Sequence, residues 1–377
     1  MKSVLLLGSY GQSNLGDDVL MWNFLQLLKD KGFTIIYANA NTTELIPEPI
    51  KKDFPELKII STYETSVFDY VQLIRQVDCV VYGGGTLYKE LYGSTGRGKY
   101  SVIVRMMGFN TLARVFGTPL YHLNIGIGSL KSSLGRWITK RAIMAATHTI
   151  FRDRKSYDYA HKALDIPKNK ITKSTDGLFL NHIWEKPWHE AEIKVDRRKY
   201  ENVVGVNVLS DIPDWIDRDK YIQTMQTFVG ELLAAGNFVL LVPFQHAFNP
   251  RSDKVFMEDI FAKELRDEAC DLLPQVPIDE ISSVLRECDV FVGMRFHALL
   301  LSLVNQVPFV AVAYDTKCWR LIEEIDYPHA VELEKLEAKT LIEHYQNAIK
   351  TVDATKKQLT RNTKQLYKEA EETAWNP

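Results

Sequence analysis

An arginine and a histidine stand two residues apart in the segment VGMRFHALLLS, at Arg295 and His297. The apolar runs before and after them predict a buried strand followed by a helix, so both side chains fall at a strand-to-helix turn. Free backbone N–H groups and the helix dipole make such a turn favourable to anions. A lone histidine is more often structural, but one placed two residues after an arginine at such a turn favours a functional role in a site that faces an anion.

Two further candidates follow predicted strands of the same half of the chain. The strand VPFVAVAY ends in the turn YDTK, which places Lys317 near Arg295, because the carboxyl ends of neighbouring parallel strands share one edge of a sheet. His246 in VPFQH also follows a predicted strand. It either reaches the same edge or only orders its loop.

The first strand-to-helix turn, GSYGQSNLGDD, contains Asn14, Asp17 and Asp18. Its backbone N–H groups can hold an anion or a hydroxyl-rich ligand, and a tight turn with helix-capping aspartates is an equal alternative. The glycine spacing is not GxGxxG, so a dinucleotide site is not indicated. GSTGRGK (93–99) has the spacing of a phosphate-binding loop, but Tyr100 replaces the required Ser or Thr, and we interpret the segment as a loop.

Two motifs add candidates from the first half of the chain. GGGTLY follows a strand directly, and glycines such as Gly84 and Gly85 permit close approach of a ligand to the backbone. FRDRKS places Arg152 at a strand end, where its guanidinium can bind two oxygens at once. A structural pair with an aspartate is the alternative for Arg152. Asp176 in STDGLF is a weaker candidate that either joins the site or orders a loop.

These motifs are carried by repeated alternation of short apolar runs with longer amphipathic ones, which predicts parallel sheets with helices on both faces. The polar segment 180–202 interrupts the alternation, and we interpret it as a linker. The sequence therefore predicts an α/β protein of two Rossmann-like domains facing across a cleft, the GT-B-like architecture, at 1–185 and 200–345. A charged helical tail at 346–377 either crosses back to the first domain or stays a solvated terminal helix.

The composition limits the class of protein. A chain of 377 residues exceeds what one core usually holds, and 46% hydrophobic with 25% charged residues is typical of a soluble globular protein. A net charge of −2 argues against a surface built for nucleic acid, although a local basic cleft is compatible with that total. Neither the four cysteines nor any other cluster has metal-ligand spacing, so no metal is expected. No stretch approaches the roughly 20 apolar residues of a membrane span, and the first apolar run is too short for a signal peptide.

Taken in order, the motifs resemble the polysaccharide pyruvyltransferase family. The matches are GSYGQSNLGDD, GGGTLY, IGIGS, FRDRKS, VPFQH and VGMRFHALLLSLVNQVPFVAVAYDTK. The resemblance implies a GT-B-like fold, phosphoenolpyruvate as the donor substrate, a sugar acceptor and no cofactor. By position it implies Arg152, Arg295 and Lys317 as donor-binding residues and His297 as the acid. The family commonly has glutamate where this chain has Asp18. The remaining candidates for acceptor or loop contacts are Asn14, Asp17, Asp18, Gly84, Gly85 and His246.

The implied chemistry is ketal formation. A proton reaches the methylene carbon of the enol, two sugar hydroxyls add to the neighbouring carbon, and phosphate leaves. Histidine, with an ordinary pKa of about 6.5, can supply that proton near neutral pH, and arginine can hold the donor's carboxylate and phosphate.

Two alternatives stay open. A nucleotide-sugar glycosyltransferase would have the same fold, and a non-catalytic binding or assembly protein would belong to another class. The presence of Arg152, Arg295, His297 and Lys317 together argues against the second. We expect a cytoplasmic protein. Because acceptors of such pathways are often lipid-linked, peripheral contact with the inner face of the membrane is compatible with this expectation.

Overall fold

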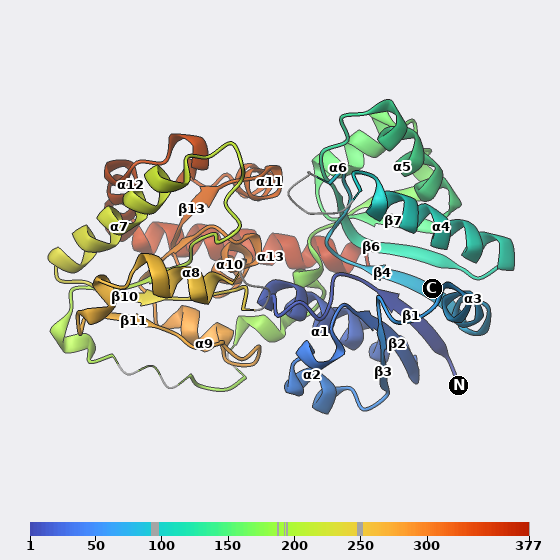
Figure 1. Cartoon of the computed structure of the whole chain (residues 1–377), viewed down its shortest axis with the longest axis horizontal. Coiled ribbons are helices and arrows are strands. Elements are labelled where there is room, and N and C mark those ends of the chain that lie inside the picture. Colours follow the sequence, from blue (N-terminus) through green and yellow to red (C-terminus); the bar gives the residue numbers. More distant parts are fainter. Residues whose placement is uncertain (92–97, 187, 192, 194, 247–251, 377) are drawn as a thin grey trace. The chain divides into compact units, whose positions relative to one another are not determined.

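The computed structural model describes residues 1–376 except 92–97, 187, 192, 194 and 247–251. The chain forms two compact units, and each has its own parallel sheet (Figure 1). The N-terminal unit comprises Met1–Gln12, Asp17–Asn181 and Leu366–Pro377, and the C-terminal unit comprises Ser13–Gly16 and His182–Gln365. Each unit therefore contains a short segment that is distant in sequence from its main part.

The sheet of the N-terminal unit is parallel and has the order β3-β2-β1-β4-β6-β7-β8, with β5 paired to β6. Its strands are β1 (Ser3–Leu7), β2 (Ile35–Ala40), β3 (Leu57–Ser61), β4 (Cys79–Gly83), β5 (Thr86–Tyr88), β6 (Leu120–Ile127), β7 (His148–Phe151) and β8 (Ile171–Lys173). In the central strand β1, Val4, Leu5 and Leu6 are all fully buried. Because successive side chains point to opposite faces, both faces of this sheet are covered.

Helices pack on these faces. They are α1 (Leu15–Asp30), α2 (Glu48–Asp53), α3 (Val67–Gln76), α4 (Ser101–Phe116), α5 (Ser133–Ala145) and α6 (Arg154–Asp158), and α6 continues into a π-helical turn at Tyr159–Ala163. Inner residues of α3, α4, α5 and the π-helical turn share one apolar cluster with Leu5 and Leu7 of β1. These four segments therefore cover the same face of the sheet.

The C-terminal unit repeats the arrangement with the order β11-β10-β9-β12-β13-β14, again parallel. Its strands are β9 (Val203–Val206), β10 (Phe238–Leu241), β11 (Cys270–Leu272), β12 (Val290–Gly293), β13 (Phe309–Ala313) and β14 (Ala330–Glu332). Its helices are α7 (Arg218–Ala234), α8 (Asp253–Ile260), α9 (Ile281–Arg286), α10 (Phe296–Val304), α11 (Thr316–Glu324) and α12 (Ala338–Lys350). The order 3-2-1-4-5-6 is the Rossmann order, so this unit has the predicted topology.

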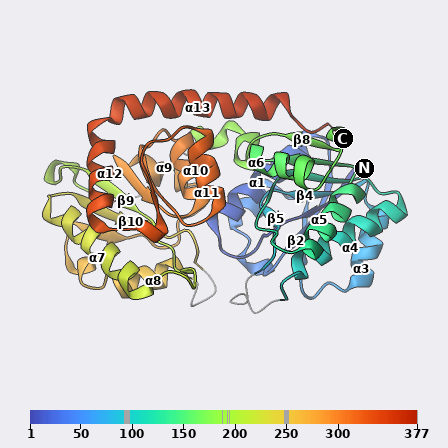
Figure 2. The ribbon, with the colours of Figure 1, turned by 90° about the horizontal axis from the view of Figure 1, so that it is seen from above.

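The last helix, α13 (Val352–Glu372), contributes to both units (Figure 2). In the C-terminal unit, Thr363 Oγ1 donates a hydrogen bond to the carbonyl of Leu303. In the N-terminal unit, the ring of Trp375 stacks on Phe33 with 6.2 Å between the ring centroids. The tail therefore crosses back to the first domain, as one of the two sequence alternatives predicted.

Two further findings concern the described part of the chain. All four cysteines are buried and form no disulfide. No helix among the described residues combines the length and the apolar character that crossing a membrane requires.

Candidate functional site

Arg295 lies between β12 and α10, and its backbone N–H donates to Asn207 Oδ1 at 3.0 Å. Its guanidinium pairs with two carboxylates, with Nη2 2.6 Å from Asp253 Oδ1 and Nη1 2.9 Å from Asp211 Oδ1. Nη2 also donates to Ser210 Oγ. Burial would lower the pKa of this guanidinium, but the charges of Asp253 and Asp211 raise it above its usual value. Arg295 is therefore a permanent cation in a fixed position.

Asp253, the first residue of α8, is completely buried and ties several strand ends together. Its carboxylate accepts hydrogen bonds from the backbone N–H groups of Phe244 and Gln245 beyond β10, and from Ser210 Oγ beyond β9. Asp211, in contrast, is 46% exposed. Of the two carboxylates that pair with Arg295, only that of Asp211 is therefore open to solvent.

His297 lies in the first turn of α10, against the backbone of Gly16. A Cβ atom on Gly16 would overlap Nδ1 of the imidazole, so only glycine fits at this position. Gly16, the second residue of α1, belongs to the segment Ser13–Gly16 that is part of the C-terminal unit. In the same segment, Asn14 forms a β-bridge to Gln245, and its Nδ2 donates to Gln245 Oε1 at 2.8 Å. The first glycine-rich loop therefore contacts the histidine that the sequence predicts as the acid.

His246 follows Gln245, and its backbone N–H donates to the carbonyl of Ser13 at 3.0 Å. Burial lowers the pKa of the His246 imidazole to about 4. His246 is therefore neutral at pH 7 and lies beside the loop that carries Asn14.

Lys317 lies in the first turn of α11, with Nζ 3.4 Å from Asp315 Oδ2. The same Nζ is 5.9 Å from the ring centroid of Phe296, the residue between Arg295 and His297. Burial lowers the pKa of Lys317, but the charge of Asp315 leads a set of interactions that raise it overall. The structure thus adds a second cation beside the Arg-Phe-His turn.

In the N-terminal unit, Arg152 follows β7 and is 5% exposed. Its Nη1 donates to Asp176 Oδ2 at 3.0 Å and its Nη2 donates to Thr86 Oγ1 at 2.8 Å. A Cβ atom on Gly126 would lie 3.0 Å from Nε, so Gly126 leaves room for the side chain. Asp176, a weak candidate from the sequence, is thus a direct partner of Arg152, and it also accepts a hydrogen bond from the Leu178 N–H.

The turn before Thr86 has a backbone conformation that favours glycine. Gly84 and Gly85 have φ values of +69° and +80°, in the left-handed region. Gly85 accepts a hydrogen bond from the Gly126 N–H at 2.8 Å, which joins this turn to β6. The turn therefore positions the threonine that contacts Arg152.

Asp17 and Asp18 lie in the first turn of α1 and belong to the N-terminal unit. Asp18 is buried, and its burial together with the charge of Asp17 raises the pKa of its carboxyl well above the usual value. Of the predicted loop 93–99, residues 93–97 lie outside the described residues.

The structure assembles the candidates in two sets. The C-terminal unit brings together Asn14, His246, Arg295, His297 and Lys317. The N-terminal unit places Arg152 beside the turn of Gly84 and Gly85. The partners that the sequence did not identify are Gly126, Thr86, Asp211 and Asp253. Within the described residues, no three His, Cys, Asp or Glu side chains are close enough to hold a metal ion.

A family model described as polysaccharide pyruvyl transferase matches residues 14–316. A comparison with curated protein sequences finds no match.

Solved structures resemble the chain over almost its whole length. A glycosyltransferase from Rickettsia africae has a TM-score of 0.62 at 12% identity, with 98% of this chain and 97% of that chain covered. A putative UDP-N-acetylglucosamine 2-epimerase from Listeria monocytogenes has a TM-score of 0.63 at 10% identity, with 100% and 98% covered. The UDP-GlcNAc 2-epimerase from Neisseria meningitidis, bound to UDP-GlcNAc, has a TM-score of 0.59 at 10% identity, with 99% and 100% covered. With the two strand orders, these similarities confirm the predicted GT-B-like fold of two Rossmann-like domains.

Proposed function

Because the chain belongs to the polysaccharide pyruvyl transferase family, we propose that it moves pyruvate from phosphoenolpyruvate onto two hydroxyls of one sugar in a cell-surface polysaccharide or its precursor. The products are a cyclic ketal and phosphate. The observation that carries the proposal is the family match over residues 14–316, which includes Arg152, Arg295 and His297. Lys317 follows immediately after the matched region.

In the proposed reaction, His297 protonates the methylene carbon of the donor, which becomes a methyl group. The neighbouring carbon becomes cation-like and is attacked by the first sugar hydroxyl. Loss of phosphate and attack by the second hydroxyl then complete the ketal. Of the two hydroxyl protons released, one balances the proton given to the methyl group and the other leaves with phosphate.

We assign the donor's anionic groups to the cations. Arg152 and Arg295 keep their charge throughout and can each bind two oxygens of a carboxylate or phosphate. Lys317, beside Phe296, adds a point charge. The N-terminus of α10, a nine-residue helix that begins directly after Arg295, favours negative charge at the same turn. These features support a donor that carries both a carboxylate and a phosphate.

The test is incubation of the purified protein with phosphoenolpyruvate and a panel of nitrophenyl and lipid-linked glycosides. Mass spectrometry of the glycosides should reveal a pyruvyl adduct, and phosphate should appear in equal amount. Omission of the donor is the control. Phosphate release without an adduct on any glycoside would leave only hydrolysis and would count against transfer.

The alternative is a nucleotide-sugar glycosyltransferase of the same fold. The structural similarity to the Rickettsia africae glycosyltransferase gives this alternative some support. Thermal unfolding with phosphoenolpyruvate and with a set of nucleotide sugars separates the two functions. A ligand that binds only the folded state raises the melting temperature. We expect a rise with phosphoenolpyruvate, whereas a rise with a nucleotide sugar alone would favour the alternative.

A further inference from the structure

A long segment of the N-terminal unit contains no acidic residue. Between Glu90 and Asp153 the sequence has no Asp or Glu, yet it has nine Lys and Arg residues, at Arg97, Lys99, Arg105, Arg114, Lys131, Arg136, Lys140, Arg141 and Arg152. The segment thus carries a charge of +9 and the rest of the chain −11, which together give the net −2. A nearly neutral chain therefore contains one strongly basic region.

This region includes α4 and α5, which pack side by side, with α3 next to α4. The outer surfaces of the three helices expose large apolar side chains. These are Val67 and Phe68 on α3, Val104, Val115 and Phe116 on α4, and Leu134 and Trp137 on α5. Elsewhere in the described chain, such exposed side chains are Met1, Tyr63, Trp215 and Val255. An apolar surface concentrated on one layer of helices marks an interaction site.

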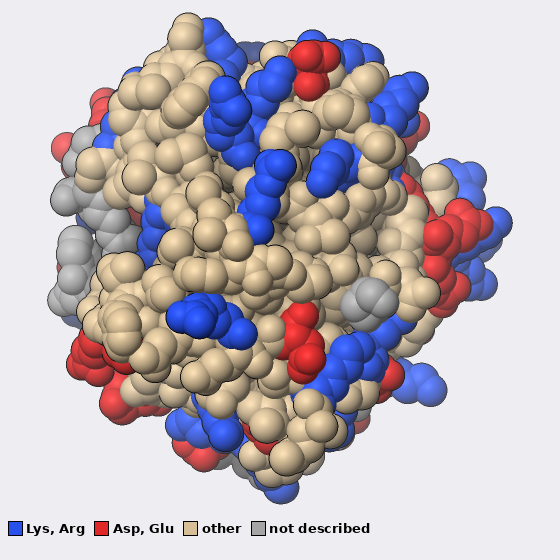
Figure 3. Space-filling model, turned by 90° about the vertical axis from the view of Figure 1, so that its right-hand side faces the viewer, with Lys and Arg blue, Asp and Glu red and all other residues tan. Residues whose placement is uncertain are grey.

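Cations lie among these apolar side chains. On α5, Leu134, Trp137 and Arg141 have the spacing of one helix face, and the Arg141 guanidinium is 5.6 Å from the Trp137 ring. The Arg75 guanidinium of α3 is 5.4 Å from the Phe116 ring. Figure 3 looks onto the side of the N-terminal unit where α3 and α4 are labelled in Figure 1. In its upper half, Lys and Arg side chains gather among uncharged residues, while acidic ones lie mostly toward the margins and lower half.

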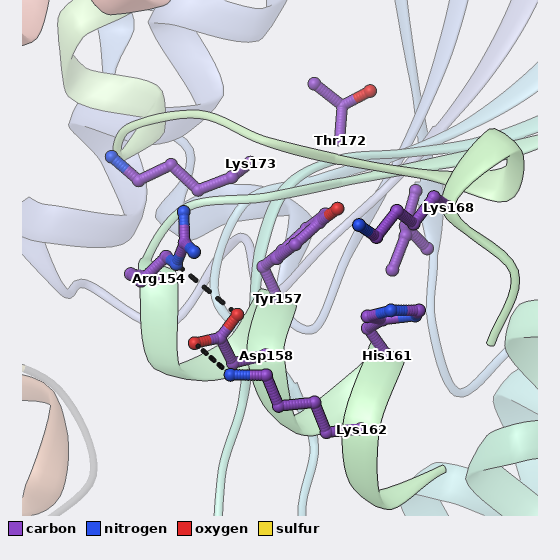
Figure 4. A pocket seen from close by; sticks show the side chains of 9 residues that line it. Arg154, Tyr157, Asp158, His161, Lys162, Lys168, Thr172 and Lys173 are labelled. Carbon is purple, nitrogen blue, oxygen red and sulfur yellow. Dashed lines mark hydrogen bonds and ion pairs between the residues drawn. The ribbon is translucent and has the colours of Figure 1, made fainter. Parts of the chain in front are cut away.

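A basic pocket of about 460 Å³ lies next to this layer, between α6, the π-helical turn and β8 (Figure 4). Its cations are Arg154, Lys162, Lys168 and Lys173. Arg154 and Lys162 share Asp158, and Lys173 pairs with Glu369, so cations remain in excess. The nearby Lys170 donates to the carbonyl of Ala146, directly after α5. This hydrogen bond places the pocket near the C-terminal end of α5.

We propose that the outer face of α3, α4 and α5 docks on the surface of a bilayer that contains anionic lipid. Trp137, Leu134 and Phe116 can insert into the apolar part of such a surface. The cations among them can bind its negative headgroups. A second copy of the chain is a poor occupant, because two identical basic faces would repel each other across a symmetric interface. The proposal rests on the exposed apolar side chains of this face and on its positive charge. It does not depend on which reaction the protein catalyses.

The test is co-sedimentation of the full chain with vesicles of phosphatidylcholine alone and of phosphatidylcholine mixed with phosphatidylglycerol. We expect binding to the mixed vesicles that falls as salt is raised. Trp137→Ser should weaken this binding severalfold, and Arg114→Glu with Arg141→Glu should weaken it by about fivefold or more for each charge. Matched controls lie in the C-terminal unit. Trp215→Ser changes a tryptophan that is 57% exposed, against 50% for Trp137, and Lys356→Glu with Lys357→Glu reverses two exposed charges on α13. Neither control should change binding.

Three outcomes would overturn the proposal. The first is that the protein binds both kinds of vesicle equally well. The second is that the control variants lose as much vesicle binding as the α4 and α5 variants do. The third is that sedimentation velocity detects a dimer that Trp137→Ser dissociates. Transfer to a water-soluble glycoside should be unchanged in all four variants. That measurement separates loss of docking from loss of the proposed reaction, and it also reports whether the variants fold.

Discussion

Each unit of the molecule has an arginine at a strand-to-helix turn. Arg152, Asp153 and Arg154 follow β7, whereas Arg295, Phe296 and His297 follow β12. In each turn the first arginine is largely buried and pairs with a buried carboxylate. The next two positions differ between the units.

In the N-terminal unit, Asp153 caps α6 by accepting a hydrogen bond from the Ser156 N–H at 2.7 Å, and Arg154 is 69% exposed. In the C-terminal unit, the middle residue Phe296 is buried, and His297 rests on a glycine backbone. The turn of the N-terminal unit therefore presents cations, and the turn of the C-terminal unit presents a cation with a titratable group. We infer that charge recognition is common to both turns and that proton transfer belongs to the second alone.

The largest effect on turnover is expected when the imidazole of His297 is removed. His297→Ala should lower turnover by about 10²–10⁴-fold, the usual contribution of a general acid, with a smaller change in the Michaelis constant for phosphoenolpyruvate. Steady-state rates of pyruvyl transfer measure both quantities. His182→Ala, at an exposed histidine, is the control. Turnover near that of the wild type would remove the proposed difference between the two turns.

The second largest effect on turnover is expected at Gly16, the glycine that contacts His297. Gly16→Ala forces the imidazole to move, and a displacement of about 1 Å can lower turnover by about 10²-fold. Gly126→Ala crowds Arg152 less severely and should have a smaller effect, mainly on the donor Michaelis constant. Gly108→Ala on α4, where the added methyl meets open space, is the matched control. Equal effects at Gly16 and Gly126 would contradict the assignment of proton transfer to one turn.

The two arginines should resemble each other in donor binding. Arg152→Ala and Arg295→Ala should each raise the donor Michaelis constant by about 10–10²-fold, because each removes a charge-assisted contact. Each also leaves a buried carboxylate unpaired, at a cost of about 3–5 kcal/mol in the free energy of unfolding.

The two effects of Arg295→Ala can be separated. Adding Asp253→Asn to Arg295→Ala should recover stability, measured by urea unfolding, but not donor affinity. A donor Michaelis constant that stays unchanged in the single variant would show that Arg295 only supports the fold.

The smallest expected effect concerns pH. Each unit contains a buried histidine whose pKa is lowered by burial, to about 3 for His122 and to about 4 for His246. Between these values and about 6.5 the unfolded chain binds more protons, so stability is full above that range and falls as the pH falls through it.

For His122 the loss between pH 7 and pH 5 should be about 2 kcal/mol. Urea unfolding at the two pH values measures it, and His122→Gln, which keeps a polar side chain beside Tyr88 and Thr149, should reduce the dependence by about that amount while the part that comes from His246 remains. An equally steep dependence in that variant would assign the effect to other groups.

Local patterns in the sequence predicted the strands and the turns, because apolar runs and glycines act over a few residues. Those patterns identified Arg152, Arg295, His297 and Lys317 as residues at strand ends. The partners of the arginines depend on contacts between distant residues. Asp176 is 24 residues from Arg152, and Asp253 is 42 residues from Arg295. The strand order determines which carboxylate pairs with which arginine. No local pattern in the sequence predicts that order.

The same limit applies to the glycine-rich loop and the tail. The sequence indicated a loop that can contact a ligand, but the contact of Gly16 with His297 joins residues from opposite ends of the matched region. The charged character of the tail and its lack of glycine and proline before Pro377 predicted a helix. Its destination was left open, because it depends on the stacking of Trp375 on Phe33.

The exchange of segments between the units has a consequence for how the protein is made. Ser13–Gly16 is synthesised before the rest of the C-terminal unit, and Leu366–Pro377 is synthesised after the rest of the N-terminal unit. Trp375 can therefore cover Phe33 only after the main part of the C-terminal unit has been synthesised. We expect the nascent N-terminal unit to remain a partly open intermediate until Trp375 has been added. Neither half is then a natural fragment for expression alone.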